Sequence, residues 1–182
     1  MIFEFCNLHN EYKTKFIKTI YHRVEILNMD SEFRELYQEI IMDHNRSPRN
    51  FRKMEDATCR LDGRNPLCGD QYTIYLRVKD DIIEDASFEG SGCAISKASA
   101  SVMTDVLKGK KLKDADELFE IFHKILTGQT APTKYLDKLG KLAAFAGVAE
   151  FPVRVKCATL AWHTMHNCLH NRPDMVTTEE DI

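Results

Sequence analysis

The stretch YTIYLRVKDDIIEDASF, residues 72–88, decides the fold because it has the pattern of a β-hairpin. From Tyr72 to Val78, apolar and polar residues alternate, as in a strand with one buried face. Asp80 and Asp81 then mark a turn, and the rest of the stretch returns antiparallel. The chain entering the hairpin and the chain leaving it are therefore predicted to lie at one end of a small sheet.

Thiols stand on both sides of this hairpin. Before it, a turn in the sequence Asn65-Pro66-Leu67-Cys68-Gly69-Asp70 sets a thiol and a carboxylate two residues apart. The proline restricts the residue before it to extended backbone angles, and the glycine allows angles that other residues avoid. After it, Gly90-Ser91-Gly92-Cys93 leads into an apolar pattern with helical spacing. The hairpin is therefore expected to bring Cys68 and Cys93 together.

Apolar residues at helical spacing predict five helices. The first, second and last follow Ser31, Cys93 and Pro152, and the other two run through residues 118–126 and 136–145. The predicted fold class is α+β, with a small antiparallel β-sheet packed against several helices. We expect residues 61–70 to form a loop that approaches the hairpin.

A chain of 182 residues is long enough for one domain with its own core. We predict this domain at residues 30–172, followed by an acidic tail at 173–182 that is expected to be disordered. Residues 1–29 are predicted as an extension, either a docking arm or a segment outside the native protein, with Met29 as an alternative start.

Charge and hydropathy exclude several classes of function. The formal charge of −3 gives no basic field for nucleic acid, and no apolar run approaches the roughly 20 residues that span a bilayer. Without a secretory signal, the protein is expected in the cytoplasm, where its six cysteines would be reduced thiols in metal or redox roles. Cys59 and Cys168 are predicted as core thiols.

Three thiols and one carboxylate are candidates for a metal site. Cys93 and Cys157 are predicted near helix N-termini, where unpaired N–H groups favour the thiolate. With Cys68 and Asp70 they fit tetrahedral zinc, and the three thiolates with one variable ligand could equally hold an iron–sulfur cluster. The spacing contains no C-x-x-C pair, so the residues leave both possibilities open.

Four stretches of the chain carry a family likeness. They are residues 36–44 with 47–50, residues 65–70, residues 88–96 and residues 154–162. Together they resemble the ordered motifs of the SufU/IscU/NifU-type iron–sulfur assembly proteins, over about residues 31–168. Lys156 stands where IscU-type scaffolds place a histidine, and 64 positions separate Cys93 from Cys157, which is similar to the SufU type with its inserted segment.

This resemblance implies a zinc-dependent sulfurtransferase. Zinc would be held by Cys68, Asp70, Cys93 and Cys157, and Cys68 would accept persulfide sulfur from a SufS-type cysteine desulfurase for downstream iron–sulfur assembly proteins. Arg154 and Lys156 would offset the charge of the site or meet an acidic partner. The alternatives are a scaffold on which a [2Fe–2S] cluster is assembled, or a zinc-stabilised interaction module.

Histidines on the first and the last predicted helix are further candidate ligands. His163, His166 and His170 fall on one face of the last predicted helix, where a packing or solvated role is favoured over a metal site. His44, on the first predicted helix, is expected to be a structural hydrogen-bonding residue.

Overall fold

The hairpin predicted for residues 72–88 is present and is longer than its sequence pattern indicated. In the computed structural model, β2 (Asp70–Lys79) and β3 (Ile82–Ser91) pair antiparallel. Asp80 and Asp81 connect them with φ angles of 50° and 59°, and positive φ at both central residues is typical of the type I′ turn that matches strand twist. The start of β2 and the end of β3, both away from the turn, therefore lie at the same end of the sheet.

The structure describes residues 35, 38–172 and 174–179. The predictions for residues 1–29 and for Ser31 lie outside these residues. Residues 38–46 are helical, as predicted. Within them His44 is 2% exposed, and its Nδ1 atom lies 2.8 Å from Ser101 Oγ, which confirms its structural role.

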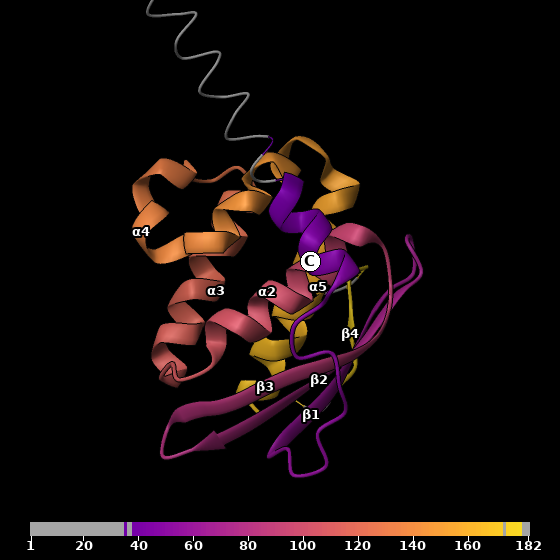
Figure 1. Ribbon diagram of the computed structural model, residues 1–182, viewed down its shortest axis with the longest axis vertical. Helices are drawn as coiled ribbons and strands as arrows, with labels where there is room; N and C mark the ends of the chain where they lie inside the picture. The colour runs from indigo at the N-terminus through magenta and orange to yellow at the C-terminus, as the bar shows by residue number, and fades with distance from the viewer. Residues whose placement is uncertain (1–34, 36–37, 173, 180–182) are drawn as a thin grey trace, which may run out of the picture. The chain divides into compact units, whose positions relative to one another are not determined.

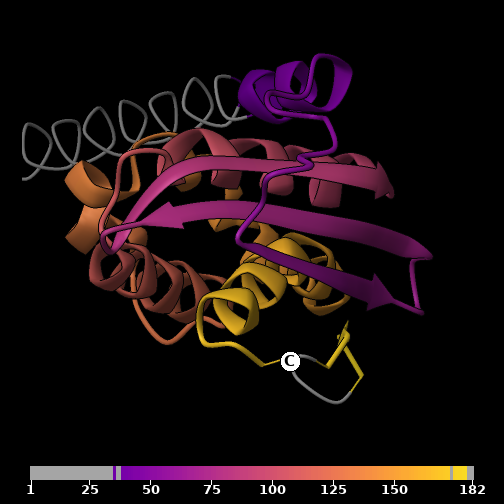
Figure 2. The same cartoon turned by 90° about the horizontal axis from the view of Figure 1, so that it is seen from below.

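Two further strands complete a four-stranded sheet of order β3-β2-β1-β4 (Figure 1). β1 (Cys59–Asn65) pairs antiparallel with β2, and the three long strands run side by side in Figure 2. β4 (Val176–Thr177) pairs parallel with β1, so the sheet is mixed. The α+β class is confirmed, with one parallel pair that the sequence did not indicate.

The loop expected at residues 61–70 is wrong as far as Asn65, because β1 occupies this part of the chain. Its alternation is hidden in the sequence by Gly63, which stands at a buried position. A Cβ atom added at Gly63 would lie 2.1 Å from Thr164 Oγ1. The last helix thus approaches β1 at a point where the structure leaves no room for a side chain.

The disorder expected for the tail is wrong for residues 176–178. Val176 and Thr178 are fully buried, and the Thr178 N–H donates to the Arg64 carbonyl at 3.2 Å. Acidic composition indicated disorder, but pairing with β1 orders this part of the segment.

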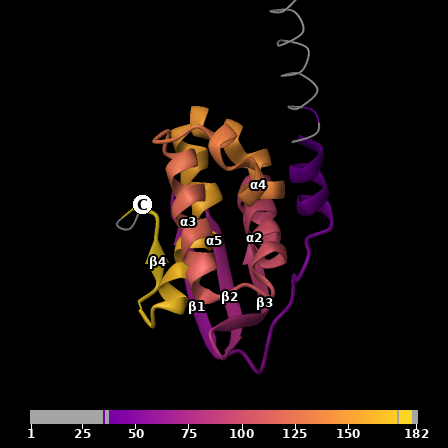
Figure 3. The ribbon, with the colours of Figure 1, turned by 90° about the vertical axis from the view of Figure 1, so that its left-hand side faces the viewer.

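The helices form layers over the sheet. They are α2 (Ala94–Leu107), α3 (Leu112–Leu126), α4 (Leu136–Leu139) and α5 (Pro152–Leu169), with 3₁₀ segments at Pro132–Tyr135 and Gly140–Glu150. α2 packs on β3 and α5 packs on β1 and β2, while α3 lies beside α5 (Figure 3). No helix in the described ranges is long and apolar enough to cross a membrane.

The core fixes α5 against α2 and the sheet. Ile74 and Leu76 of β2 are fully buried, as is Trp162 of α5. The Trp162 indole N–H donates to Ser99 Oγ at 3.2 Å, and Ser99 in turn donates to the Ala158 carbonyl at 2.6 Å. Packing and hydrogen bonds therefore set the position of the helix that carries Cys157.

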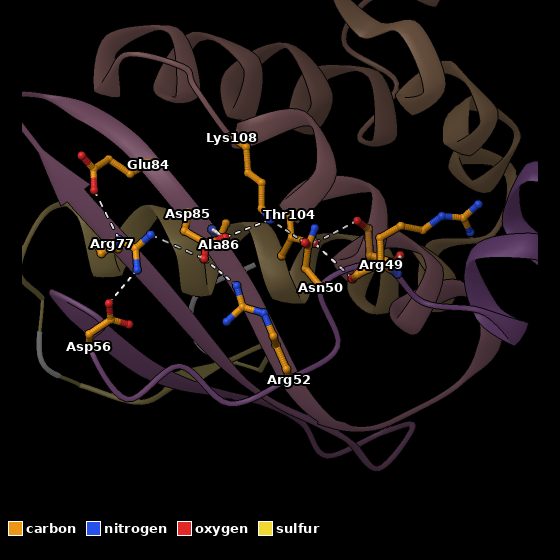
Figure 4. A network of polar contacts seen from close by, with 11 residues as sticks. Arg49, Asn50, Arg52, Asp56, Arg77, Glu84, Asp85, Ala86, Thr104 and Lys108 are labelled. Atoms are coloured by element: carbon orange, nitrogen blue, oxygen red, sulfur yellow. Dashed lines mark hydrogen bonds and ion pairs between the residues drawn. The ribbon is translucent and has the colours of Figure 1, made fainter.

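A polar network holds the segment between residue 49 and β1 against β3 and α2 (Figure 4). At its centre, Asp85 of β3 pairs with Arg52 at 2.5 Å and with Lys108 at 2.9 Å. Burial raises the pKa of Asp85, but the hydrogen bonds from Lys108 and Arg52 more than offset this effect and leave the pKa below its usual value. Lys108 also donates to Asn50 Oδ1 at 2.6 Å, which ties this segment to the end of α2.

A disulfide joins Cys59, the first residue of β1, to Cys168 near the end of α5. Their Cα atoms are 5.9 Å apart across a sequence separation of 109. The prediction that both are reduced thiols is therefore wrong, whereas their place in the core is confirmed: Cys168 is buried in the core and Cys59 packs against it. Sequence spacing alone does not show that the strand and the helix bring these sulfurs together.

Candidate metal centre

Cys68 lies in the short connection between β1 and β2. Asn65 and Asp70 pair where the two strands end, and the Gly69 N–H donates to the Asn65 carbonyl at 2.8 Å. Gly69 has a φ angle of +71°, which glycine adopts without steric cost. This tight turn leaves Cys68 exposed.

Asp70, the first residue of β2, is fully buried. Its Oδ1 atom accepts a hydrogen bond from the Cys93 N–H at 2.7 Å, and its Oδ2 atom accepts one from Asn65 Nδ2 at 3.3 Å. A Cβ atom on Gly92 would lie 2.7 Å from Asp70 Oδ1, so the glycine before Cys93 allows the carboxylate to approach this closely. The carboxylate is thus held by Asn65 at the end of β1 and by Cys93 just after the end of β3.

Cys157, on α5, completes the group. Its Sγ atom lies 3.1 Å from Cys68 Sγ, and the ligand atoms of Cys68, Asp70 and Cys157 all lie within 4.8 Å of one another. Cys93 is not part of this group of three but lies next to it. Its backbone N–H donates to Asp70, and its side chain is hydrogen-bonded with that of Cys157. The structure therefore places all four predicted ligand residues at one site.

Cys93 is the N-cap residue of α2, and its Sγ atom accepts a hydrogen bond from the Ser96 N–H at 3.4 Å. The hydrogen bond from Cys157 lowers the pKa of Cys93 to about 6, against the effect of burial and with help from Ser96. The same contact raises the pKa of Cys157, and burial and the contact with Cys68 raise it further. Without metal, Cys93 therefore loses its proton before Cys157 does.

The prediction that a helix N-terminus also ionises Cys157 is wrong. Cys157 is the sixth residue of α5, beyond the first four N–H groups that lack helical partners. Its Sγ atom instead lies 3.6 Å from the Val153 carbonyl, an acceptor of the preceding turn. This environment favours the thiol, so Cys157 is expected to lose its proton only in exchange for a metal ion.

Three sulfurs and a carboxylate are a donor set that zinc takes in four-coordinate sites. Thiolates at the zinc–sulfur distance of about 2.3 Å lie about 3.8 Å apart in a tetrahedron. The sulfurs of Cys68 and Cys157 are 3.1 Å apart, about 0.7 Å less than this value, and because Cys68 is exposed on a turn its side chain has room to move outward by that amount. The residues present therefore fit zinc.

Comparison with known proteins shows the family of the chain. The profile described as "NifU-like N terminal domain" matches residues 36–158. The chain belongs to the NifU-like N-terminal domain family. The resemblance seen in the four sequence stretches is thus confirmed.

Relatives of this NifU-like chain include the "Zinc-dependent sulfurtransferase SufU" of Bacillus subtilis (strain 168), 40% identical over 141 residues, with 76% of this chain and 92% of that protein covered. The "Iron-sulfur cluster assembly scaffold protein IscU" of Streptococcus pyogenes serotype M1 is 37% identical, with coverage of 76% and 86%. A crystal structure of a scaffold protein for the SUF system from Fervidobacterium islandicum AW-1 is similar with a TM-score of 0.68 and 36% identity, covering 72% of this chain and 94% of that one.

Asn65 of the NifU-like domain contacts the candidate ligands, a role that sequence reasoning missed. Its Nδ2 atom lies 3.3 Å from Asp70 Oδ2 and 3.4 Å from Cys157 Sγ, while its Oδ1 atom accepts a hydrogen bond from Thr178 Oγ1 at 3.0 Å. Asn65 is fully buried. Its position three residues before Cys68 in the same motif could have indicated this role. The contact with Thr178 could not be predicted, because the two residues are 113 positions apart in the sequence.

Lys156 and Arg154, the two predicted cationic neighbours of the site, make contacts outside the ligand group. Lys156 Nζ donates to the Thr178 carbonyl at 2.6 Å, and the Arg154 guanidinium lies 4.6 Å from the centre of the Phe151 ring. Lys156 thus holds the tail that supports Asn65. That either cation offsets the charge of the site remains a prediction.

The pKa of Cys93 predicts selective alkylation of the metal-free protein. Because only the thiolate is a strong nucleophile, iodoacetamide modification of Cys93 should rise with pH through a midpoint of about 6 and then level off, whereas Cys157 should stay unreactive at neutral pH. Peptide mass spectrometry of pulse-labelled samples measures both sites. Cys93 labelling that begins only near the ordinary thiol pKa would contradict the assignment.

The contacts of Asn65 predict its effect on zinc affinity. Asn65→Ala should weaken zinc binding about 10- to 100-fold, as loss of an outer-shell partner commonly does. Chelator competition measures the affinity, and Asn167→Ala, a partly buried asparagine farther along α5, is the matched control. Equal affinities of the Asn65 variant and the control would show that Asn65 does not support the ligands.

Proposed function

We propose that this NifU-like protein is a zinc-dependent sulfurtransferase of iron–sulfur cluster assembly. It accepts persulfide sulfur from a SufS-type cysteine desulfurase and hands it to downstream iron–sulfur assembly proteins. The observation that carries this proposal is the unequal exposure of the site: Cys68 is exposed, whereas Asp70 is fully buried and Cys157 is 2% exposed. The Bacillus subtilis relative is named a zinc-dependent sulfurtransferase, which supports the same function.

The chemistry requires one mobile thiolate among fixed groups. Zinc, when bound by Cys68, Asp70, Cys93 and Cys157, would keep the sulfur of Cys68 deprotonated at neutral pH. The Cys68 thiolate attacks the terminal sulfur of the donor persulfide, so a new S–S bond forms at Cys68 while the S–S bond of the donor breaks. The donor cysteine leaves as a thiolate, and Cys68 carries the transferred sulfur as its own persulfide.

The surroundings of Cys68 suit a protein partner. Leu67, its neighbour in the turn, is 61% exposed, and Val153 on the first turn of α5 is 57% exposed. The Val153 carbonyl contacts Cys157, so this second apolar side chain also lies near the ligands. We place the partner complex in the cytoplasm, where the thiols of the site would stay reduced.

The test is to map persulfide after incubation with a SufS-type cysteine desulfurase and cysteine. We expect one added sulfur atom, located on the peptide that contains Cys68, with the Cys93 and Cys157 peptides unmodified. A sample without desulfurase is the control. Bound zinc without any persulfide on Cys68 would contradict sulfur transfer and favour a zinc-stabilised interaction module.

A cluster scaffold is the second candidate function. The same three cysteine sulfurs with a variable fourth ligand can hold a [2Fe–2S] cluster, and the Streptococcus relative is named as a scaffold. Anaerobic reconstitution separates the two functions. A stoichiometric cluster that survives isolation and transfers to an apo-protein favours the scaffold, whereas sulfur transfer that depends on zinc favours the sulfurtransferase.

A further inference from the structure

A second group of metal-binding side chains lies between α3 and α5, which run side by side in Figure 3. Asp116 is on α3, His166 is in the last turn of α5, and His170 is the residue that caps α5. His166 Nδ1 lies 3.2 Å from Asp116 Oδ1, and His170 Nε2 lies 3.0 Å from the same oxygen. These three atoms all lie within 4.8 Å of one another.

The spacing of these atoms is that of a metal site. At metal–nitrogen and metal–oxygen distances of about 2.0–2.2 Å, the corners of a tetrahedron are about 3.4 Å apart. The two observed nitrogen–oxygen separations of 3.2 and 3.0 Å differ from this by only a few tenths of an ångström. Small side-chain movements therefore suffice to admit an ion.

The first imidazole is held in position by packing. The Phe119 ring stacks on His166 with a centroid distance of 4.5 Å and an interplanar angle of 16°. The side chains of His166, Asp116 and His170 are 22%, 32% and 43% exposed, so an ion can reach the group from solvent. Partial exposure leaves a fourth position open to water.

This group is distinct from the cysteine site. His166 follows Cys157 by nine residues on the same helix, which corresponds to about 14 Å along its axis. The donor set also differs, since two imidazoles and one carboxylate contain no thiolate. Imidazole suits zinc, nickel, copper and cobalt, and the combination with one carboxylate occurs in three-ligand zinc sites.

We propose that Asp116, His166 and His170 form a second binding site for a divalent transition-metal ion, which joins α3 to α5. The alternative is a plain hydrogen-bonded cluster in which both imidazoles donate to Asp116. The metal site and the hydrogen-bonded cluster are expected to respond differently when glutamine replaces His170. The glutamine amide can donate to Asp116 in place of His170, but it is a poor ligand for these ions.

The full chain is first loaded with one equivalent of zinc, which the thiolates of the cysteine site bind in preference to the histidine group. It is then titrated with Co²⁺, and bound cobalt is measured by equilibrium dialysis and visible absorption. The wild type should bind one Co²⁺ ion without a thiolate-to-cobalt charge-transfer band, because cobalt at the cysteine site would produce that band. His170→Gln should weaken this binding at least about tenfold. His123→Gln, which changes a nearby histidine of α3 outside the group, should bind like the wild type.

Two further readouts keep the test decisive. Asp116→Asn should weaken cobalt binding as His170→Gln does, and circular dichroism of both variants should match the wild type. At one fixed concentration, added Co²⁺ should raise the Tm of the wild type more than that of His170→Gln. Equal cobalt affinity in the wild type and His170→Gln, or an equal loss in His123→Gln, would overturn the proposal. Because the readout excludes thiolate bands, this result is independent of the function proposed for Cys68.

Discussion

Cys157→Ala is expected to abolish stoichiometric zinc binding at the cysteine site. Cys157 is buried and contacts Cys68 at 3.1 Å, Asn65 at 3.4 Å and the side chain of Cys93, so its loss removes the donor at the centre of the group. The loss of affinity should exceed the roughly 100-fold effect of outer-shell changes. Each 100-fold loss removes about 2.7 kcal/mol of metal-linked stability at fixed excess zinc. Chelator competition and thermal unfolding measure the two effects.

Controls separate loss of the metal from loss of packing. Met165→Leu changes another fully buried residue of α5 with little change of volume, and it should keep zinc affinity within about threefold of wild type. The metal-free forms of wild type and Cys157→Ala should unfold at similar temperatures. The stability difference seen in the presence of zinc arises from the metal ion that only the wild type binds. If Cys157→Ala keeps one zinc ion at unchanged affinity, Cys157 is not a ligand.

Breaking the Cys59–Cys168 disulfide is expected to cost about 4–5 kcal/mol of unfolding free energy. The bond closes a loop with a sequence separation of 109, and cross-links of about 100 residues restrict the unfolded chain by about this amount. Guanidinium unfolding of the wild type with and without reductant measures the loss. In a reducing compartment the pair would open, and the protein would then rely on its core and its metal.

The double variant Cys59→Ala/Cys168→Ala gives the control for this effect. Its stability should not respond to reductant, and it should resemble that of the reduced wild type. Alkylation under denaturing conditions with chelator and without reductant should modify four of the six cysteines of the wild type and all six after reduction. Modification of all six without reductant would contradict the disulfide.

The hairpin and the thiol motifs were predictable because their signals are local. Alternation in residues 72–78 places Ile74 and Leu76 inward, and the two aspartates after Lys79 mark the turn. Strand pairing then carries Cys68 and Asp70 to the same end as Cys93. Sequence neighbours and simple periodicity were sufficient for this part of the site.

The remaining features depend on contacts between distant parts of the chain. Thr178 lies in an acidic segment whose composition indicates disorder, yet it is fully buried and donates to Asn65. Asp116 meets His166 and His170 only because α3 packs beside α5. Periodicity assigns a residue to a helix face, but it does not say which other helix that face meets.

The most direct test of the central claim compares wild type with Cys68→Ala for zinc content and for stimulation of a SufS-type cysteine desulfurase. The variant retains Asp70, Cys93 and Cys157, so we expect it to keep weakened zinc binding and the wild-type fold while losing desulfurase stimulation entirely. Loss of stimulation with the fold intact would identify Cys68 as the sulfur acceptor. Undiminished stimulation by Cys68→Ala would contradict the account.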